Sequence, residues 1–205
     1  NYQNAAGVHA SNWIKDVAPQ NYVEGDGECG WIIGTGAWMY QIDGMSKNTH
    51  SGPGTGGMTS KMFWDYYDFT RDEKVLKEYS YPAIHGMSKF LTKCVKNYDG
   101  RYLCSFSASP EQIISGSWVH QHKMQQYWHT VGCGFDQQFI YENAIDDLKC
   151  AEILGVTDNV IDTEKQQLDG YGPVQIGYSG QIKEYDEEHF YGEIGEAQHR
   201  HISQL

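Results

Sequence analysis

The segment from about Phe135 to Leu154 constrains the fold more than any other part of the chain, because its apolar residues recur every three or four positions. This spacing is typical of an amphipathic helix, and Gly155 follows it as a C-cap signal. The apolar stripe consists of Phe139, Ile140, Ala144, Ile145, Leu148, Ala151 and Leu154. Alternating strand patterns are few and short elsewhere, so the sequence predicts a mainly helical fold.

Three further helices are predicted in the middle of the chain. Residues 58–79 have helical spacing that is interrupted at 70–73, which predicts two helices with Thr70 as the N-cap of the second. Another helix is predicted from Pro82 to about Val95, with proline in its first turn and an apolar side. Residues 97–100 are expected to end it.

Long segments rich in glycine, serine and aromatic residues separate these helices. They are Gly25–Gly36, Ser46–Gly57, Tyr98–Gly134 and Gly170–Gly195. Loops of this length in a compact domain are more often functional than structural, so these segments are candidates for function.

The composition disfavours several classes of partner. With 15 Lys and Arg against 27 Asp and Glu, the formal net charge is −12, which would repel nucleic acid and anionic membrane surfaces. No apolar run approaches the roughly 20 residues that span a bilayer. At 205 residues the chain could form one domain of ordinary size. Its first residues lack the basic start and apolar stretch of a signal peptide, which leaves the compartment open.

Metal and disulfide signals are weak. The five cysteines have no CxxC pair and no regular spacing, which predicts neither a zinc cluster nor a disulfide framework, and at least one thiol must lack an intrachain partner. His199 and His201, like His120 and His122, have a spacing that suits a metal or a hydroxyl-rich ligand, although either pair could be loop surface. Because spacing fixes no third ligand, we expect no metal and no cofactor.

The run Ser107–Glu111 could present one carboxyl group at a rigid turn. It has two readings. As an ordinary helix start, with Ser109 as N-cap and Pro110 next, it would keep Glu111 ionised beside the helix dipole. As a general acid, Glu111 would need a pKa raised by burial or by a like charge. The two readings therefore predict opposite chemistry.

Asp136, Gln137 and Gln138 lie at the predicted start of the 135–154 helix. The aspartate could cap that helix, and the amides could bond locally or face a ligand. Taken singly, capping is the favoured role of Asp136.

The residues of these motifs and their order along the chain together resemble the catalytic domain of glycoside hydrolase family 95, the inverting α-L-fucosidases. The matching motifs are Val8–Trp13, Phe63–Tyr67, Phe69–Thr70, Ser109–Glu111, Gly134–Gln138, Ala151–Gly155, Gln175–Gly177, Gly180–Glu184 and His199–Ser203. The resemblance covers most of the chain.

The resemblance implies that residues 1–205 are a fragment of a single (α/α)6-barrel catalytic domain that cleaves terminal, α-1,2-linked α-L-fucose with inversion. Glu111 matches the general acid of the family, which protonates the glycosidic oxygen. The implied substrate-binding residues are His199, His201, Asp136, Gln137, Trp38, Trp118, Asn12 and His9. Ordinary alternatives are loop packing for His199 and His201, helix capping for Asp136 and Gln137, and a buried core position for Trp38. The resemblance also suggests a secreted, periplasmic or cell-surface enzyme.

The chain departs from the family pattern in three places. The aspartate that serves as catalytic base, and an Asn-x-Asn segment that assists it, lie outside this chain. Residues Ile42–Lys61 interrupt what is one helix in the family, either as a loop at the pocket rim or through an error in the sequence. Phe106 stands where relatives tend to carry proline. The alternatives to a fucosidase are a truncated, non-catalytic sugar-binding protein and an α-L-galactosidase of the same family.

Overall fold

The computed structural model describes residues 2–33, 52–107 and 131–177, together with 180, 182, 183 and 186, with side chains from residue 7 onward. The described elements are α1 (Tyr2–Val17), a 3-10 turn (Pro19–Asn21), α2 (Gly54–Thr70), α3 (Glu73–Val75), a π turn (Leu76–Ser80), α4 (Tyr81–Cys94), β1 (Val95–Tyr98), β2 (Arg101–Cys104), α6 (Gly134–Leu154), α7 (Asn159–Gln167) and a 3-10 turn (Leu168–Gly170). The predicted mainly helical fold is confirmed. In the described part of the chain, no helix is long and apolar enough to cross a bilayer.

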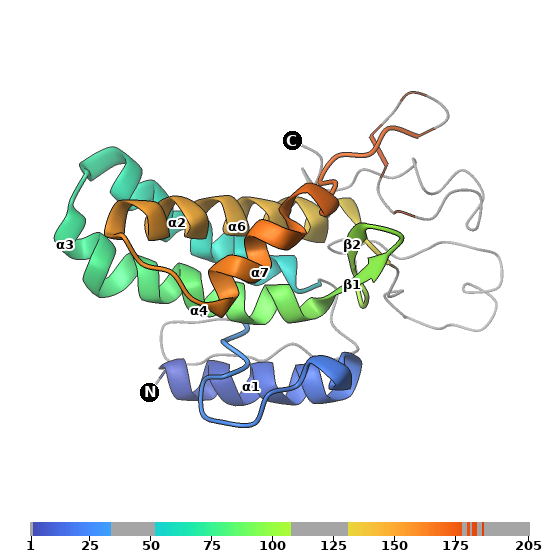
Figure 1. Ribbon diagram of the computed structural model, residues 1–205, viewed down its shortest axis with the longest axis horizontal. Helices are drawn as coiled ribbons and strands as arrows, with labels where there is room; N and C mark the ends of the chain where they lie inside the picture. The colour runs from blue at the N-terminus through green and yellow to red at the C-terminus, as the bar shows by residue number, and fades with distance from the viewer. Residues whose placement is uncertain are drawn as a thin grey trace, which may run out of the picture.

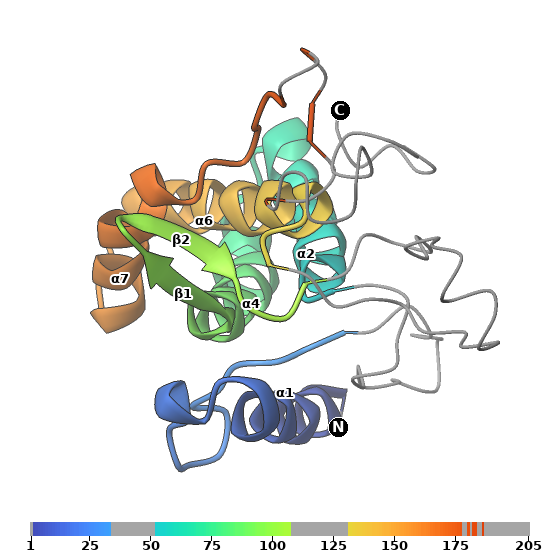
Figure 2. The same cartoon turned by 90° about the vertical axis from the view of Figure 1, so that its right-hand side faces the viewer.

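Three long helices, α2, α4 and α6, pack against one another and form the centre of the molecule (Figure 1). α2 and α6 begin at the same end of this bundle, and α4 runs in the opposite direction (Figure 1). α7 crosses α4 and α6, while α1 lies along α4 on the side that faces away from α6 (Figures 1 and 2).

The core consists of two clusters of buried residues. The larger one joins α1, α4, α6 and the loops that follow α1 and β2; its members include Trp13, Ile14, Cys29, Ile32, Met87, Phe90, Leu91, Cys94, Cys104, Ile140, Ala144 and Tyr171. The smaller one lies toward the other end of the bundle and contains Trp64, Tyr67, Leu76, Ile84 and Cys150. All five cysteines are buried, and none of them forms a disulfide.

The glycine-rich start of α2 is a helix contact rather than part of a loop. A Cβ on Gly57 would lie 2.6 Å from the carbonyl oxygen of Phe139, and one on Gly54 would lie 2.7 Å from the Cα of Asp136. Glycine is needed here because the backbones of α2 and α6 approach too closely for a side chain. The predicted loop Ser46–Gly57 is therefore wrong from Gly54 onward, and the C-terminal part of Ile42–Lys61 is helical.

The helix boundary near residue 70 also differs from the prediction. Asp72, not Thr70, caps the helix that follows, because its Oδ1 accepts a hydrogen bond from the amide of Val75 at 3.0 Å. The Thr70 hydroxyl instead donates to the Tyr66 carbonyl, at the end of α2. The two predicted helices on either side of Pro82 are continuous, since the π turn at 76–80 joins α3 to α4.

A β-hairpin that was not predicted from the sequence follows α4 directly. β1 and β2 pair antiparallel from Val95 opposite Cys104 to Tyr98 opposite Arg101. The connecting residues Asp99 and Gly100 have φ values of 51° and 89°, which fits a two-residue hairpin turn. The hairpin turns the chain back toward the end of the bundle at which α2 and α6 begin.

Candidate functional site

The Asp136 carboxylate joins three segments at the shared end of α2 and α6. Its Oδ1 accepts a hydrogen bond from the amide of Gly54 at 2.6 Å, and its Oδ2 accepts one from the Ser107 hydroxyl at 2.5 Å. The Cys133 thiol lies 3.4 Å from the same Oδ2. The side chain is fully buried, and a Cβ on Gly52 would overlap it.

The predicted capping role of Asp136 is therefore wrong. The N-cap of α6 is Cys133, which makes no side-chain cap bond, and Asp136 lies inside the helix. Its carboxylate instead occupies the N-terminus of α2, where free amides and the helix dipole favour a negative charge.

Ser107 begins the run that leads to Glu111, and its hydroxyl is held on both sides. It donates to Asp136 and accepts a hydrogen bond from the amide of Cys133 at 2.9 Å. Three residues before Ser107, the Cys104 carbonyl accepts a hydrogen bond from the amide of Gly132 at 2.9 Å. We call these four residues, Cys104, Ser107, Gly132 and Cys133, the neck, because they bring together the chain before residue 108 and the chain after residue 130.

Gln137 ties the neck to the C-terminal part of the chain. Its Oε1 accepts from the Cys104 amide at 2.8 Å, and its Nε2 donates to the carbonyl oxygens of Tyr102 at 3.1 Å and Tyr171 at 2.5 Å. The residue is only 2% exposed. Its amide is thus used to position three backbone groups, two on β2 and one at Tyr171.

Burial dominates the electrostatics around Asp136. Burial, and next the negative charge of Asp136, raise the pKa of the Cys104 thiol well above its ordinary value. The same two causes, in the same order, raise the pKa of Cys94. These thiols therefore stay protonated near neutral pH and act as small apolar side chains.

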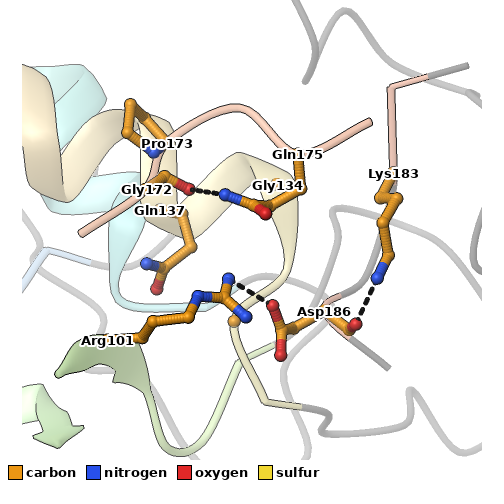
Figure 3. Close-up of a pocket in the computed structure, with 9 residues that line it drawn as sticks. Arg101, Gly134, Gln137, Gly172, Pro173, Gln175, Lys183 and Asp186 are labelled. Carbon is orange, nitrogen blue, oxygen red and sulfur yellow. Dashed lines mark hydrogen bonds and ion pairs between the residues drawn. The ribbon is translucent and has the colours of Figure 1, made fainter. Parts of the chain in front are cut away.

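A small pocket opens beside Gln137 (Figure 3). Its lining comes from β2, the start of α6 and segment 172–186, and an ion pair of 2.5 Å between Arg101 and Asp186 closes one side. Lys183 donates to the carbonyl oxygen of Asp186 at 2.5 Å. The volume of about 10 Å³ is enough for about one water molecule.

The other predicted site residues are distributed unevenly. His9 and Asn12 lie on α1, and within the described residues neither forms a hydrogen bond or ion pair with Asp136 or Gln137. α1 approaches the neck through Trp13, whose ring packs edge-on against Phe106 at 5.5 Å. Glu111, Trp38, Trp118, His199 and His201, and the pair His120 and His122, lie outside the described residues. No group of three potential metal ligands gathers in the part that the structure describes.

Sequence reasoning did not find the partners of Asp136. Gly54 and Cys133 were included only as members of the long glycine-rich segments Ser46–Gly57 and Tyr98–Gly134, and neither was singled out. The sequence pointed to this end of the bundle through the Ser107–Glu111 run and the Asp136–Gln137 pair.

Comparison with known proteins agrees with the resemblance seen in the sequence. The family described as "Glycosyl hydrolase family 95 catalytic domain" matches residues 9–205. The chain is 31% identical over 144 residues to "Alpha-L-fucosidase 2" of Arabidopsis thaliana, a match that covers 69% of this chain and 16% of that protein. It is 29% identical over 161 residues to "Probable alpha-fucosidase A" of Aspergillus niger, covering 75% of this chain and 18% of that protein. The matched region thus spans less than a fifth of either relative.

Proposed function

Since the chain belongs to the glycosyl hydrolase family 95 catalytic domains, we propose that the protein containing it is an α-L-fucosidase that releases terminal, α-1,2-linked fucose with inversion. Two relatives are named as fucosidases, which supports the substrate class. Residues 1–205 would form part of one (α/α)6 barrel, to which α2, α4 and α6 contribute.

In this proposal Glu111 is the general acid. It gives its proton to the glycosidic oxygen as the bond to the anomeric carbon breaks, while water attacks that carbon from the opposite face. A carboxylate from outside this chain takes the proton of the water, and the two carboxyl groups of an inverting pair lie about 6.5–9.5 Å apart. His199 and His201 would bind sugar hydroxyls, and Trp38 and Trp118 would pack on the sugar. His9 and Asn12 would line the pocket.

The hydrogen bond from Ser107 to Asp136 is the observation that carries this proposal. It attaches the start of the Ser107–Glu111 run to the N-termini of two helices. Glu111 follows four residues later, so the chain keeps its Cα within about 14 Å of Ser107. Asp136 and Gln137 would act as positioning residues, because their polar atoms already bind protein groups.

The test uses the complete protein with Glu111→Gln, and with Glu152→Gln, an exposed residue of α6, as control. We expect Glu111→Gln to lower kcat/KM on 2′-fucosyllactose by about 100-fold or more, while a fucoside with a very good leaving group is spared. Proton NMR of the first product should show the inverted anomer. Equal loss on both substrates would contradict the acid role, and faster turnover of the matching α-L-galactoside would assign the other sugar.

Ser107→Ala tests the positioning step in the same assay, with Ser105→Ala as its matched control. Both hydroxyls bind protein groups at this end of the bundle, but among the described residues the Ser105 hydroxyl bonds only to the Cys94 carbonyl. We expect Ser107→Ala to lose activity mainly on 2′-fucosyllactose, because a misplaced acid matters most for a poor leaving group. Similar losses for the two serine variants would show that the neck does not position Glu111.

A further inference from the structure

A second polar cluster joins α4, α6 and α7, at a distance from the neck. Asp147 and Glu164 are buried in it, while His85 is half-buried and Asp158 is exposed. His85 on α4 lies between two carboxylates: its Nδ1 is 2.9 Å from Asp147 on α6, and its Nε2 is 2.9 Å from Asp158 at the start of α7. When both ring nitrogens face carboxylates, both can donate only if the imidazole is protonated. Tyr81 packs against the same ring at 5.0 Å.

Glu164 brings a further acid from α7 into this cluster. It is 1% exposed, and it interacts electrostatically with Asp147, which is fully buried. Two carboxyl groups can share a hydrogen bond only if one of them keeps its proton. Asp147 Oδ1 and Glu164 Oε2 are buried without a donor among the described residues, and a carboxylic acid proton is the donor that would satisfy them.

Burial and the surrounding charges together favour the protonated form of Glu164, and the surrounding charges favour that of His85. Burial and then the charge of Asp147 raise the pKa of Glu164 well above 4.5. Burial lowers the pKa of His85, but hydrogen bonding to Asp147 and the charges of Asp147 and Asp158 outweigh it and raise the pKa above 6.5. Lys89 on α4 opposes the His85 charge, and Asp26 lines the cleft that His85 and Lys89 share.

We propose that this cluster is a proton-dependent lock, in which a proton shared by Asp147 and Glu164 and a proton on His85 hold α7 against α4 and α6. Loss of these protons leaves unpaired carboxylates in the core, and α7 detaches. The argument for the lock does not rest on the proposed fucosidase chemistry, because none of its residues belongs to the candidate site.

α7 connects the lock to the candidate site. Its last residue, Gln167, accepts a hydrogen bond from the Tyr171 hydroxyl at 2.8 Å, and the Tyr171 carbonyl accepts one from Gln137. Asp147 and Asp136 lie on the same helix, about 16 Å apart along its axis. A detached α7 would therefore loosen one of the three backbone groups that Gln137 holds.

The direction of the pH effect follows from proton binding. Both groups have raised pKa values in the folded protein, so the folded state binds more protons than the open one. The stabilisation is complete below the unfolded values of about 4.5 for Glu164 and 6.5 for His85. It is lost as the pH rises through the higher pKa values of the folded state. The loss of each proton then increases the equilibrium constant for opening by up to tenfold per pH unit.

Hydrogen exchange of the complete protein at pH 6.0 and 8.0 tests the lock, after correction for the intrinsic exchange rate. In the wild type we expect protection of peptides covering 159–171 to fall by about tenfold or more at pH 8.0. In Glu164→Gln the fall should be smaller by about threefold or more, because a neutral amide needs no shared proton. Asp162→Asn, an exposed carboxylate on the same helix, is the control and should behave as wild type.

Two outcomes would overturn the proposal. One is equal protection of the wild type at both pH values, and the other is a fall in Glu164→Gln as large as that in wild type. If Glu164→Gln fails to fold, Asp147→Asn neutralises the other member of the pair and is held to the same criteria. The fucosidase assay is a separate readout, so failure of one proposal leaves the other standing.

Discussion

At the scale of single residues, buried charges have partners from distant parts of the chain. Asp146 on α6 is almost fully buried and pairs with Lys61 on α2 at 3.0 Å. Lys61 also bonds to Glu142. Burial raises the pKa of Asp146 to about 6, although Lys61 opposes this rise. The lysine thus compensates a carboxylate that would otherwise be costly to keep ionised in the core.

Replacing this lysine should have a pH-dependent effect. We expect Lys61→Met to lower the free energy of unfolding by about 3 kcal/mol at pH 7.5, because it leaves Asp146 uncompensated. The folded pKa of Asp146 lies above its ordinary 3.8, so the folded state gains stability as the pH falls through about 6. The loss should accordingly be smaller at pH 5, as measured by urea unfolding at both pH values.

Lys149→Met is the matched control for this measurement. Lys149 is more exposed and only approaches Asp146, at 4.0 Å, so its loss should be about 1 kcal/mol or less at either pH. A Lys61→Met loss that is the same at pH 5 and 7.5 would show that packing, rather than charge, explains the role of Lys61.

At the scale of elements, the sequence predicted helices well where apolar spacing was regular. The 135–154 helix was predicted to within one residue of α6, because its stripe and Gly155 are local signals. α7 was missed because its nine residues include few apolar ones, and tertiary contacts hold it in place. The start of α2 was missed because glycine signals loops as well as close helix contacts.

The candidate site was predictable only in part, for a related reason. The Ser107–Glu111 run and the Asp136–Gln137 pair were both singled out from sequence. The hydrogen bond between them depends on how α2 and α6 pack, which no local pattern records. A capping role for Asp136 was the natural local prediction, and a partner on another helix replaced it.

The contact between α2 and α6 can be tested with two glycine substitutions. Gly57→Ala would place a Cβ 2.6 Å from the Phe139 carbonyl, so we expect a loss of about 1–3 kcal/mol in the free energy of unfolding. Gly7→Ala on α1 meets its nearest neighbour at 3.7 Å and should be neutral or stabilising, since alanine favours helix. If thermal unfolding shows equal effects for both, the helices do not pack as closely as described.

At the scale of the whole molecule, one face of α2 is apolar and exposed. Met58, Met62, Tyr66 and Phe69 follow one another at helical spacing, and Phe69 is 89% exposed. Contiguous apolar faces are usually covered in a folded protein. Under the proposed barrel, other helices of the complete protein would cover this face.

Methionine oxidation can test that part of the proposal. In the complete protein we expect peroxide to oxidise Met62 at least about tenfold more slowly than a methionine in a denatured control, because the barrel excludes solvent from it. Met87 is 2% exposed and serves as the internal reference for full protection. Oxidation of Met62 as fast as in the denatured control would leave this face open and argue against the barrel.

The neck has a consequence for how this fold can diversify. Because Ser107 and Cys133 meet through a single hydroxyl, the chain leaves and re-enters the helix bundle at nearly the same point. The entropic cost of closing a chain between two neighbouring points grows only slowly with the length of that chain. We therefore expect a change in the number of residues between Ser107 and Cys133 to cost little folding stability, because the bundle itself holds the two flanking residues together.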